Sequence, residues 1–196
     1  MSRDFDTRAA LLNSAKAEFL EKGFEQASLR AICARAHVTT GAFYSNFEKK
    51  DDLFRALIDP MMGAYDSLYE RAVALQCATK GDVRSGELAI MDFVMDHRDE
   101  FKLLFDCAQG SSYEGCKAAL LERFDKTCQE SFDERAGEPV DPALVRTVVR
   151  MRFQQYVEMI YSDYDREHVL RITELLYVFL RNGSEALMKE MKERPG

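Results

Sequence analysis

The residues best suited to chemistry lie between positions 28 and 50, where small polar side chains stand beside cationic and aromatic ones. Their spacing is that of a helix–turn–helix, whose second short helix can lie in the major groove of DNA. Small side chains at the start of that helix let its backbone approach phosphates and base edges closely. The predicted DNA-contacting residues are Ser28, Thr39, Thr40, Gly41, Ala42, Tyr44, Ser45, Asn46, Lys49 and Lys50.

Capping residues define the elements that would position this motif. We expect a first helix over residues 4–22, ended by Gly23 in a left-handed conformation. Ser28 and Thr39 are suitable N-caps for the two short helices that follow. His37 lies in the turn between them, and histidine tolerates a positive φ better than most residues.

Charge is distributed unevenly along the chain. The 196 residues carry a net charge of −7, which by itself argues against binding a polyanion. Residues 1–58, however, hold nine Lys/Arg and eight Asp/Glu, so the acidity belongs to the rest of the chain. The N-terminal part is therefore free to bind DNA.

No pattern typical of an enzyme or a metal site is found. The sequence has no HExxH motif, no phosphate-binding glycine loop and no nucleophile spaced to meet a base. The three histidines lie far apart, and five cysteines without a CxxC pair indicate reduced thiols. We therefore expect no enzymatic activity, no cofactor and no metal. Cys107 and Cys116 could form a redox pair, although buried inert thiols are the simpler interpretation.

Hydropathy excludes a membrane-spanning helix and a secretory signal. The longest apolar run, residues 175–180, is far shorter than the 18 or more residues that a span requires. Charged residues begin at position 3, where the apolar stretch of a signal peptide would start. We expect a cytoplasmic protein without membrane contact.

Beyond the N-terminal motif the chain is predicted to be helical throughout, because no segment shows the period-2 alternation of a strand. A helix from about residue 50 should be kinked or broken at Pro60, since proline removes a backbone hydrogen bond and clashes with the preceding turn. A loop is expected at residues 80–82. The helices expected after it cover about residues 85–97, 99–108, 111–135, 142–161 and 166–192.

For three of these helices the sequence also predicts how the helix begins or which surface it buries. Ser111 and Glu114 have the spacing of a capping box, and Asp141–Pro142 provide an N-cap followed by proline at the first helical position. The helix over 166–192 has one polar stripe and is otherwise apolar, so it should pack on its own domain and on a second copy of the chain. We expect a homodimer formed through the last two helices.

The segment from Leu11 to Phe54 resembles the DNA-binding domain of the tetracycline-repressor (TetR) family of bacterial transcription regulators, over about a quarter of the chain. The matching landmarks are Ala15, Phe19, Gly23, Phe24, Ile32, Cys33, Ala36, Val38, Thr39, Gly41, Tyr44, Phe47, Lys50 and Leu53. The resemblance implies that Thr39, Tyr44 and Lys50 hold DNA phosphates. It also implies that the helix from residue 50 links this head to a ligand-binding domain.

The expected architecture is all-α, with a helix–turn–helix head of three helices at residues 1–50 and a ligand-binding and dimerisation domain at 51–196. In this family the effector lies inside the helical bundle. The predicted pocket residues are Met62, Tyr65, Phe93, His97, Leu104, Cys116, Phe153 and Tyr156. Because most are apolar or aromatic, a hydrophobic or aromatic effector is expected. His97 is alternatively a cation that a helix C-terminus favours.

These expectations lead to one function and one alternative. The first is a transcriptional repressor that binds a near-palindromic double-stranded operator as a homodimer and is released by a small-molecule effector. The alternative is a helical adaptor that binds protein, with a DNA-binding head that no longer functions. It is left open because the head departs from the family pattern at His37, at residues 45–46 and at Lys49.

Overall fold

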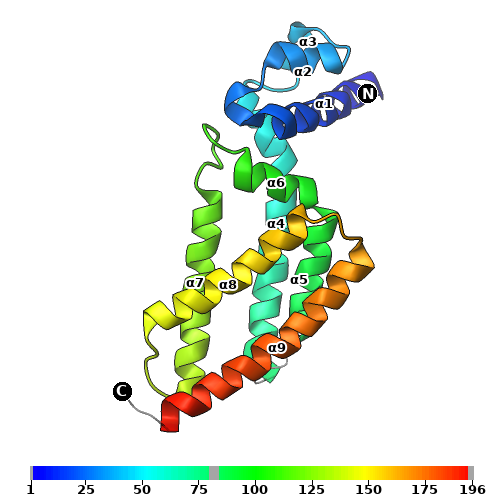
Figure 1. Ribbon diagram of the computed structural model, residues 1–196. Coiled ribbons are helices and arrows are strands. Elements are labelled where there is room, and N and C mark those ends of the chain that lie inside the picture. The colour runs from blue at the N-terminus through cyan, green and yellow to red at the C-terminus, as the bar shows by residue number, and fades with distance from the viewer. Residues whose placement is uncertain (1, 80–83, 194–196) are drawn as a thin grey trace. The chain divides into compact units, whose positions relative to one another are not determined.

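The computed structural model describes the backbone of residues 2–79 and 84–193, so the loop predicted at 80–82 lies outside the described residues. Side chains are described for residues 7–74, 84–191 and 193. Every regular element in these ranges is a helix, as predicted, and Figure 1 labels them. They are α1 (Ser2–Gln26), α2 (Leu29–Arg35), α3 (Thr40–Tyr44), α4 (Lys50–Thr79), α5 (Arg84–Asp96), α6 (Arg98–Asp106), α7 (Cys116–Ala136), α8 (Pro142–Tyr161) and α9 (Arg166–Glu193). None of them is long and apolar enough to cross a lipid bilayer.

The helices pack into two compact units. The first comprises Met1–Asp66 and His97–Lys117, and the second comprises Ser67–Asp96 and Ala118–Gly196. Helices α4 and α7 contribute residues to both units.

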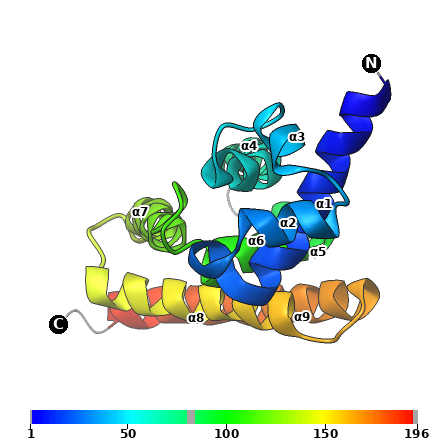
Figure 2. The same ribbon diagram turned by 90° about the horizontal axis from the view of Figure 1, so that it is seen from above.

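The core of the first unit is built from phenylalanine side chains of α1, α3 and α4. Phe19, Phe43 and Phe54 are almost fully buried, and the rings of Phe19 and Phe54 meet edge to face with centroids 5.2 Å apart. Fully buried Leu11 and Ile32 extend this core along α1 and α2, which contact each other, as do α2 and α3 (Figure 2). Burial of each such side chain contributes about 1.5–3 kcal/mol, enough to fix α2 and α3, which with 7 and 5 residues are too short to be stable alone.

Local signals set the helix ends of this unit, and the predictions for Ser28, Thr39 and His37 are confirmed. Gly23 has the expected positive φ, 75°, but the helix does not end there: α1 kinks at Gly23 and continues to Gln26. The side chains of Ser28 and Thr39 accept hydrogen bonds from the N–H groups three residues further on, at 3.4 and 3.1 Å. His37 has a φ of 55°, so the turn between α2 and α3 has the left-handed geometry that was expected.

Pro60 was expected to kink or break its helix; the break is not found, and the kink stays a prediction. Helix α4 continues through it from Lys50 to Thr79. Ile58 and Met61, which flank the exposed proline, are buried and hold the backbone on both sides. The packing of these side chains outweighs the single hydrogen bond that proline removes.

The predicted capping box at Ser111 is also wrong, because α7 begins five residues later, at Cys116. The hydroxyl of Ser111 donates to the carbonyl of Ala108 at 2.6 Å, and the carboxylate of Glu114 accepts from the N–H of Gly110 at 3.1 Å. Both side chains therefore stabilise a turn that precedes the helix. The same residue types serve caps and turns, and the sequence spacing does not distinguish the two.

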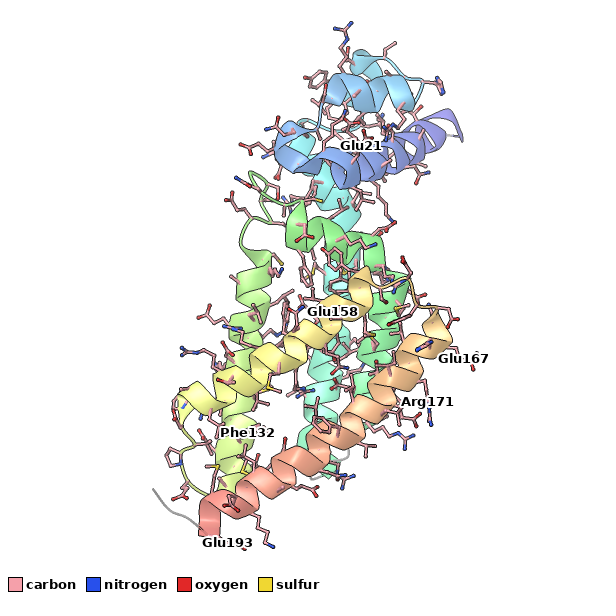
Figure 3. The ribbon with its side chains drawn as sticks, viewed as in Figure 1. Glu21, Phe132, Glu158, Glu167, Arg171 and Glu193 are labelled. Atoms are coloured by element: carbon pink, nitrogen blue, oxygen red, sulfur yellow. The ribbon has the colours of Figure 1, made fainter. Side chains whose placement is uncertain are left out.

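The second unit is a bundle in which α5 packs against α8 and α9. Asp141 caps α8 by accepting from the N–H of Ala143 at 2.8 Å, and Pro142 opens a helix with the predicted bounds. Apolar side chains of α7, α8, α9 and the loop before α8 form its core cluster, in which Phe132 (Figure 3) packs with Val140, Val145, Val149 and Met188. Charged residues such as Glu167 and Arg171 project outward from α9 (Figure 3).

Candidate nucleic-acid interface and ligand cavity

Helix α3 presents a continuous polar surface because its apolar side chains face the core. Phe43 is buried, whereas Thr40, Gly41 and Tyr44 are exposed, Tyr44 by 62%. The rings of Tyr44 and Phe43 pack edge to face with centroids 5.2 Å apart, so the buried phenylalanine positions the exposed tyrosine. The other predicted contact residues that are exposed are Ser28, Thr39, Ser45 and Lys49; Ala42, Asn46 and Lys50 are partly buried.

Arg8 adds a cation beside α3 that was not among the predicted residues. Its guanidinium lies 4.4 Å from the centroid of the Phe47 ring, and it donates to the backbone carbonyl of Asn46 at 3.4 Å. The side chain is exposed, so the cation also faces solvent. Arg8 lies 38 positions before Asn46 in the sequence, so only tertiary packing brings it to the surface that α3 presents.

The side chain of Lys50 forms hydrogen bonds within the protein in this structure. Its ammonium donates to the carbonyls of Phe24, Glu25 and Ala27 at 2.6, 3.2 and 3.0 Å. It also lies 4.5 Å from the centroid of the Phe24 ring. Lys50 therefore caps the C-terminal end of α1, where carbonyl groups lack helical partners. Its contact with DNA phosphate remains a prediction.

A buried carboxylate joins α1 to α2 behind this surface. Glu18 is 1% exposed and accepts from Lys22 at 2.8 Å and from the N–H of Ser28 at 3.5 Å, while Arg35 lies 3.7 Å away. The hydrogen bond from Lys22 lowers the pKa of Glu18 below its ordinary value, against the opposing effect of burial. The N-cap residue of α2 is therefore positioned by a charged network.

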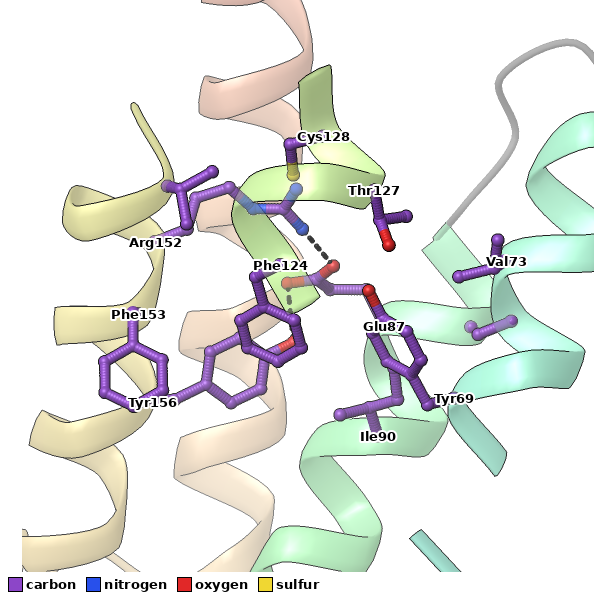
Figure 4. A pocket seen from close by; sticks show the side chains of 13 residues that line it. Tyr69, Val73, Glu87, Ile90, Phe124, Thr127, Cys128, Arg152, Phe153 and Tyr156 are labelled. Atoms are coloured by element: carbon purple, nitrogen blue, oxygen red, sulfur yellow. Dashed lines mark hydrogen bonds and ion pairs between the residues drawn. The ribbon is translucent and has the colours of Figure 1, made fainter. Parts of the chain in front are cut away.

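The second unit contains a cavity of about 110 Å³ (Figure 4). Its lining residues are Tyr69, Ala72, Val73, Gly86, Glu87, Ile90, Phe124, Thr127, Cys128, Val149, Arg152, Phe153 and Tyr156. Of the predicted pocket residues, Phe153 and Tyr156 line it. The others lie outside it: Met62, Tyr65, Phe93, His97, Leu104 and Cys116.

Several of these outlying residues have other contacts. The ring of Tyr65 packs edge to face on Phe101, with centroids 5.6 Å apart, in the first unit. Leu104 is buried in the same unit. His97 lies directly after α5, with Nδ1 4.0 Å from the carboxylate of Glu100. Helical periodicity identified these side chains as inward-facing, and it could not distinguish core from cavity wall.

An ion pair lies at one end of the cavity. The carboxylate of Glu87 accepts from the guanidinium of Arg152 at 2.6 Å and from the hydroxyl of Tyr156 at 3.0 Å (Figure 4). Glu87 is buried, and its negative charge raises the pKa of Arg152 above the ordinary value. A buried charge must be paired in this way, since an isolated one is costly to desolvate.

The sequence positions of Glu87 and Arg152 indicate this ion pair, although neither residue was among the predicted pocket residues. Glu87 lies three and seven positions before Ile90 and Val94, both buried, so the carboxylate is in phase with the apolar face of α5. Arg152 is likewise in phase with Val149 and Tyr156 on α8. A charged residue in phase with an apolar face predicts a partner of opposite sign.

The cysteines have little thiolate character. Burial raises the pKa of Cys33, Cys107, Cys116 and Cys128 alike, and none of the four forms a disulfide. A raised pKa disfavours the reactive form, which argues against the redox pair considered above. The side chain of Cys77 lies outside the described residues. Among the described residues no group of three His, Cys, Asp or Glu side chains could hold a metal ion.

Comparison with known proteins finds similarity to an N-terminal segment of the chain. The family described as "Bacterial regulatory proteins, tetR family" matches residues 11–57. The repressor BepR of Brucella suis is 45% identical over 53 residues, 27% of this chain, and the regulator UidR of Escherichia coli is 40% identical over 52 residues, 26% of this chain. The chain spans about a quarter of the length of these relatives, 25% and 26%.

The fold of the whole chain is also represented among solved structures. A transcriptional regulator of the "TerR/AcrR family" from Aquifex aeolicus has a TM-score of 0.63 and 16% identity, with 89% of this chain and 99% of that one covered. At this identity the likeness shows the fold alone. The sequence match at residues 11–57 and the shared helical architecture agree: this segment matches the tetR family of bacterial regulatory proteins, and the chain has the fold of such a regulator.

Proposed function

We propose that this chain is a transcriptional repressor that binds a near-palindromic DNA operator as a homodimer and is released by a small molecule held in the cavity of the second unit. The observation that carries the proposal is the exposed polar surface of α3, fixed on a buried phenylalanine core within the segment that matches the family. Two such heads would enter successive major grooves, about 34–36 Å apart.

The unpartnered apolar surface of the last two helices supports dimer formation. Leu175, Val178 and Phe179 of α9 and Met151 of α8 are 47–67% exposed in the single chain. Large apolar side chains exposed together on neighbouring helices commonly mark an interface. A second copy would cover them by the same surface, which gives a two-fold arrangement that matches a palindromic operator.

Helix α4 supports coupling between effector and DNA. It begins at Lys50, which caps α1 of the head, and continues without interruption to Tyr69 and Val73, which line the cavity. A ligand that moves these side chains would therefore act on the element that holds the head. By linkage, effector and operator weaken each other's binding by the same factor.

The test is selection of random duplex DNA on the purified chain, followed by titration of the enriched sequence. We expect a two-fold-related motif and an affinity that falls steeply with salt, because cationic groups displace counterions from phosphates. Tyr44→Ala should weaken binding at least tenfold while thermal unfolding is unchanged. Tyr164→Ala, which removes a 46% exposed tyrosine of the second unit, is the matched control. Failure of a folded dimer to enrich any motif would reject DNA binding and favour the adaptor.

A further inference from the structure

The cavity has aromatic walls of restricted shape. Tyr69 and Phe124 stack with ring centroids 5.4 Å apart and an interplanar angle of 27°, and Phe124 meets Phe153 at 61°. The volume of about 110 Å³ is somewhat below the roughly 150 Å³ of a cavity that accepts benzene. The space therefore has room for one aromatic ring at most, and a larger ligand would have to displace side chains.

The polar end of the cavity has no net charge, because Glu87 and Arg152 neutralise each other. Both keep hydrogen-bonding capacity after their mutual contact. A guanidinium has five N–H donors, of which the bonds to Glu87 and to the thiol of Cys128 use two, and a carboxylate offers about four acceptor positions, of which Arg152 and Tyr156 occupy two. A ligand group placed here meets a donor and an acceptor side by side.

We propose that the cavity binds a small neutral phenol, with its ring against Tyr69, Phe124 and Phe153 and its hydroxyl bonded to the Glu87–Arg152 pair. This inference rests on the proposed effector role of the cavity and names the chemical class of the effector. A hydroxyl donates to the carboxylate and accepts from the guanidinium, so it complements both partners. A ligand carboxylate would meet Glu87 and a ligand ammonium would meet Arg152, and either would bring an unpaired charge beside the buried Glu87 carboxylate.

Isothermal titration of the full chain, without DNA, tests the ligand class. The probes are phenol, benzene, cyclohexanol, benzoate and benzylamine. We expect phenol to bind tightest and each of the others at least tenfold more weakly, because each lacks the hydroxyl, lacks the flat ring or carries a charge. Equal binding of benzene and phenol, or tighter binding of benzoate or benzylamine, would overturn the proposal.

A charge change at Glu87 provides a second readout. Glu87→Gln leaves the positive charge of Arg152 unbalanced, so the variant should prefer benzoate over phenol, which reverses the order of the unchanged chain. Glu158→Gln, an exposed change on α8, should leave the order intact. If Glu87→Gln weakens the binding of all five probes by the same factor, the effect is on the fold, and that result would count against a direct contact between Glu87 and the ligand. If Glu87→Gln fails to fold, the probe series on the unchanged chain decides the proposal alone.

Parallel operator titrations separate this inference from the proposed function. Phenol that binds the chain and leaves DNA affinity unchanged would uphold the ligand class and reject its effector role. A chain that binds its operator and ignores phenol would reject the ligand class alone.

Discussion

Substitution of Glu18 by Gln should destabilise the head of this protein in a pH-dependent way. The carboxylate is 1% exposed, and Gln in its place would keep the shape of the side chain but lose the charge that Lys22 and Arg35 face at 2.8 and 3.7 Å. Hydrogen bonds to a charged group contribute about 1.5–3 kcal/mol. Both cationic partners are more than 40% exposed, so solvent screens them and we expect a loss of about 1–2 kcal/mol at pH 7.

The sign of the pH dependence follows from the lowered pKa of Glu18. The ionised carboxylate is favoured in the folded state, so its stabilisation is complete above the unfolded pKa of about 4.3 and disappears as the pH falls through the folded pKa. The difference between the unchanged chain and Glu18→Gln should therefore be largest at neutral pH and small near pH 3.

Urea unfolding followed by circular dichroism at several pH values measures this difference. Glu21→Gln is the matched control, because Glu21 also pairs with Arg35, at 2.9 Å, but is 56% exposed. We expect the control to cost less than about 0.5 kcal/mol. Equal losses for the two variants at pH 7, or a loss for Glu18→Gln that persists undiminished near pH 3, would refute the reasoning.

Two further substitutions test other contacts. Lys50→Met removes three hydrogen bonds from an ammonium to backbone carbonyls, so it should lower the unfolding free energy by about 2–3 kcal/mol. Lys49→Met, at an exposed site, should change the unfolding free energy by less than about 0.5 kcal/mol. Equal effects of the two substitutions in urea unfolding would contradict the capping role of Lys50. Phe179→Glu introduces a charge into the proposed dimer surface, where the phenylalanine is 67% exposed, and should convert dimer to monomer in light scattering without loss of helicity. Lys126→Glu, at an exposed position of α7 outside the proposed surface, should leave the dimer intact, and an unchanged dimer with Phe179→Glu would exclude this surface.

Predictions from sequence were most accurate where the physics is local. A capping hydroxyl needs only the N–H three residues further on, so Ser28 and Thr39 could be assigned without knowing any tertiary contact. Gly23 and His37 were assigned in the same way, because the strain of a positive φ depends on the residue itself. The failures at Pro60 and Ser111 have the opposite character: packing on both sides of the proline and competing turn hydrogen bonds decided the outcome.

The sequence by itself determined that the described part of this chain is helical, where most of its helices begin and end, and that residues 11–57 match the tetR family. Only the tertiary structure decided which inward-facing residues enclose a cavity and which fill the core. Periodicity reports the direction of a side chain from its own helix axis, whereas a cavity depends on the distance to the helices opposite. Three other contacts depend on tertiary structure for the same reason: Arg8 with the residues after α3, Lys50 with the end of α1, and Glu87 with Arg152. Each of these contacts joins residues more than 20 positions apart in the sequence.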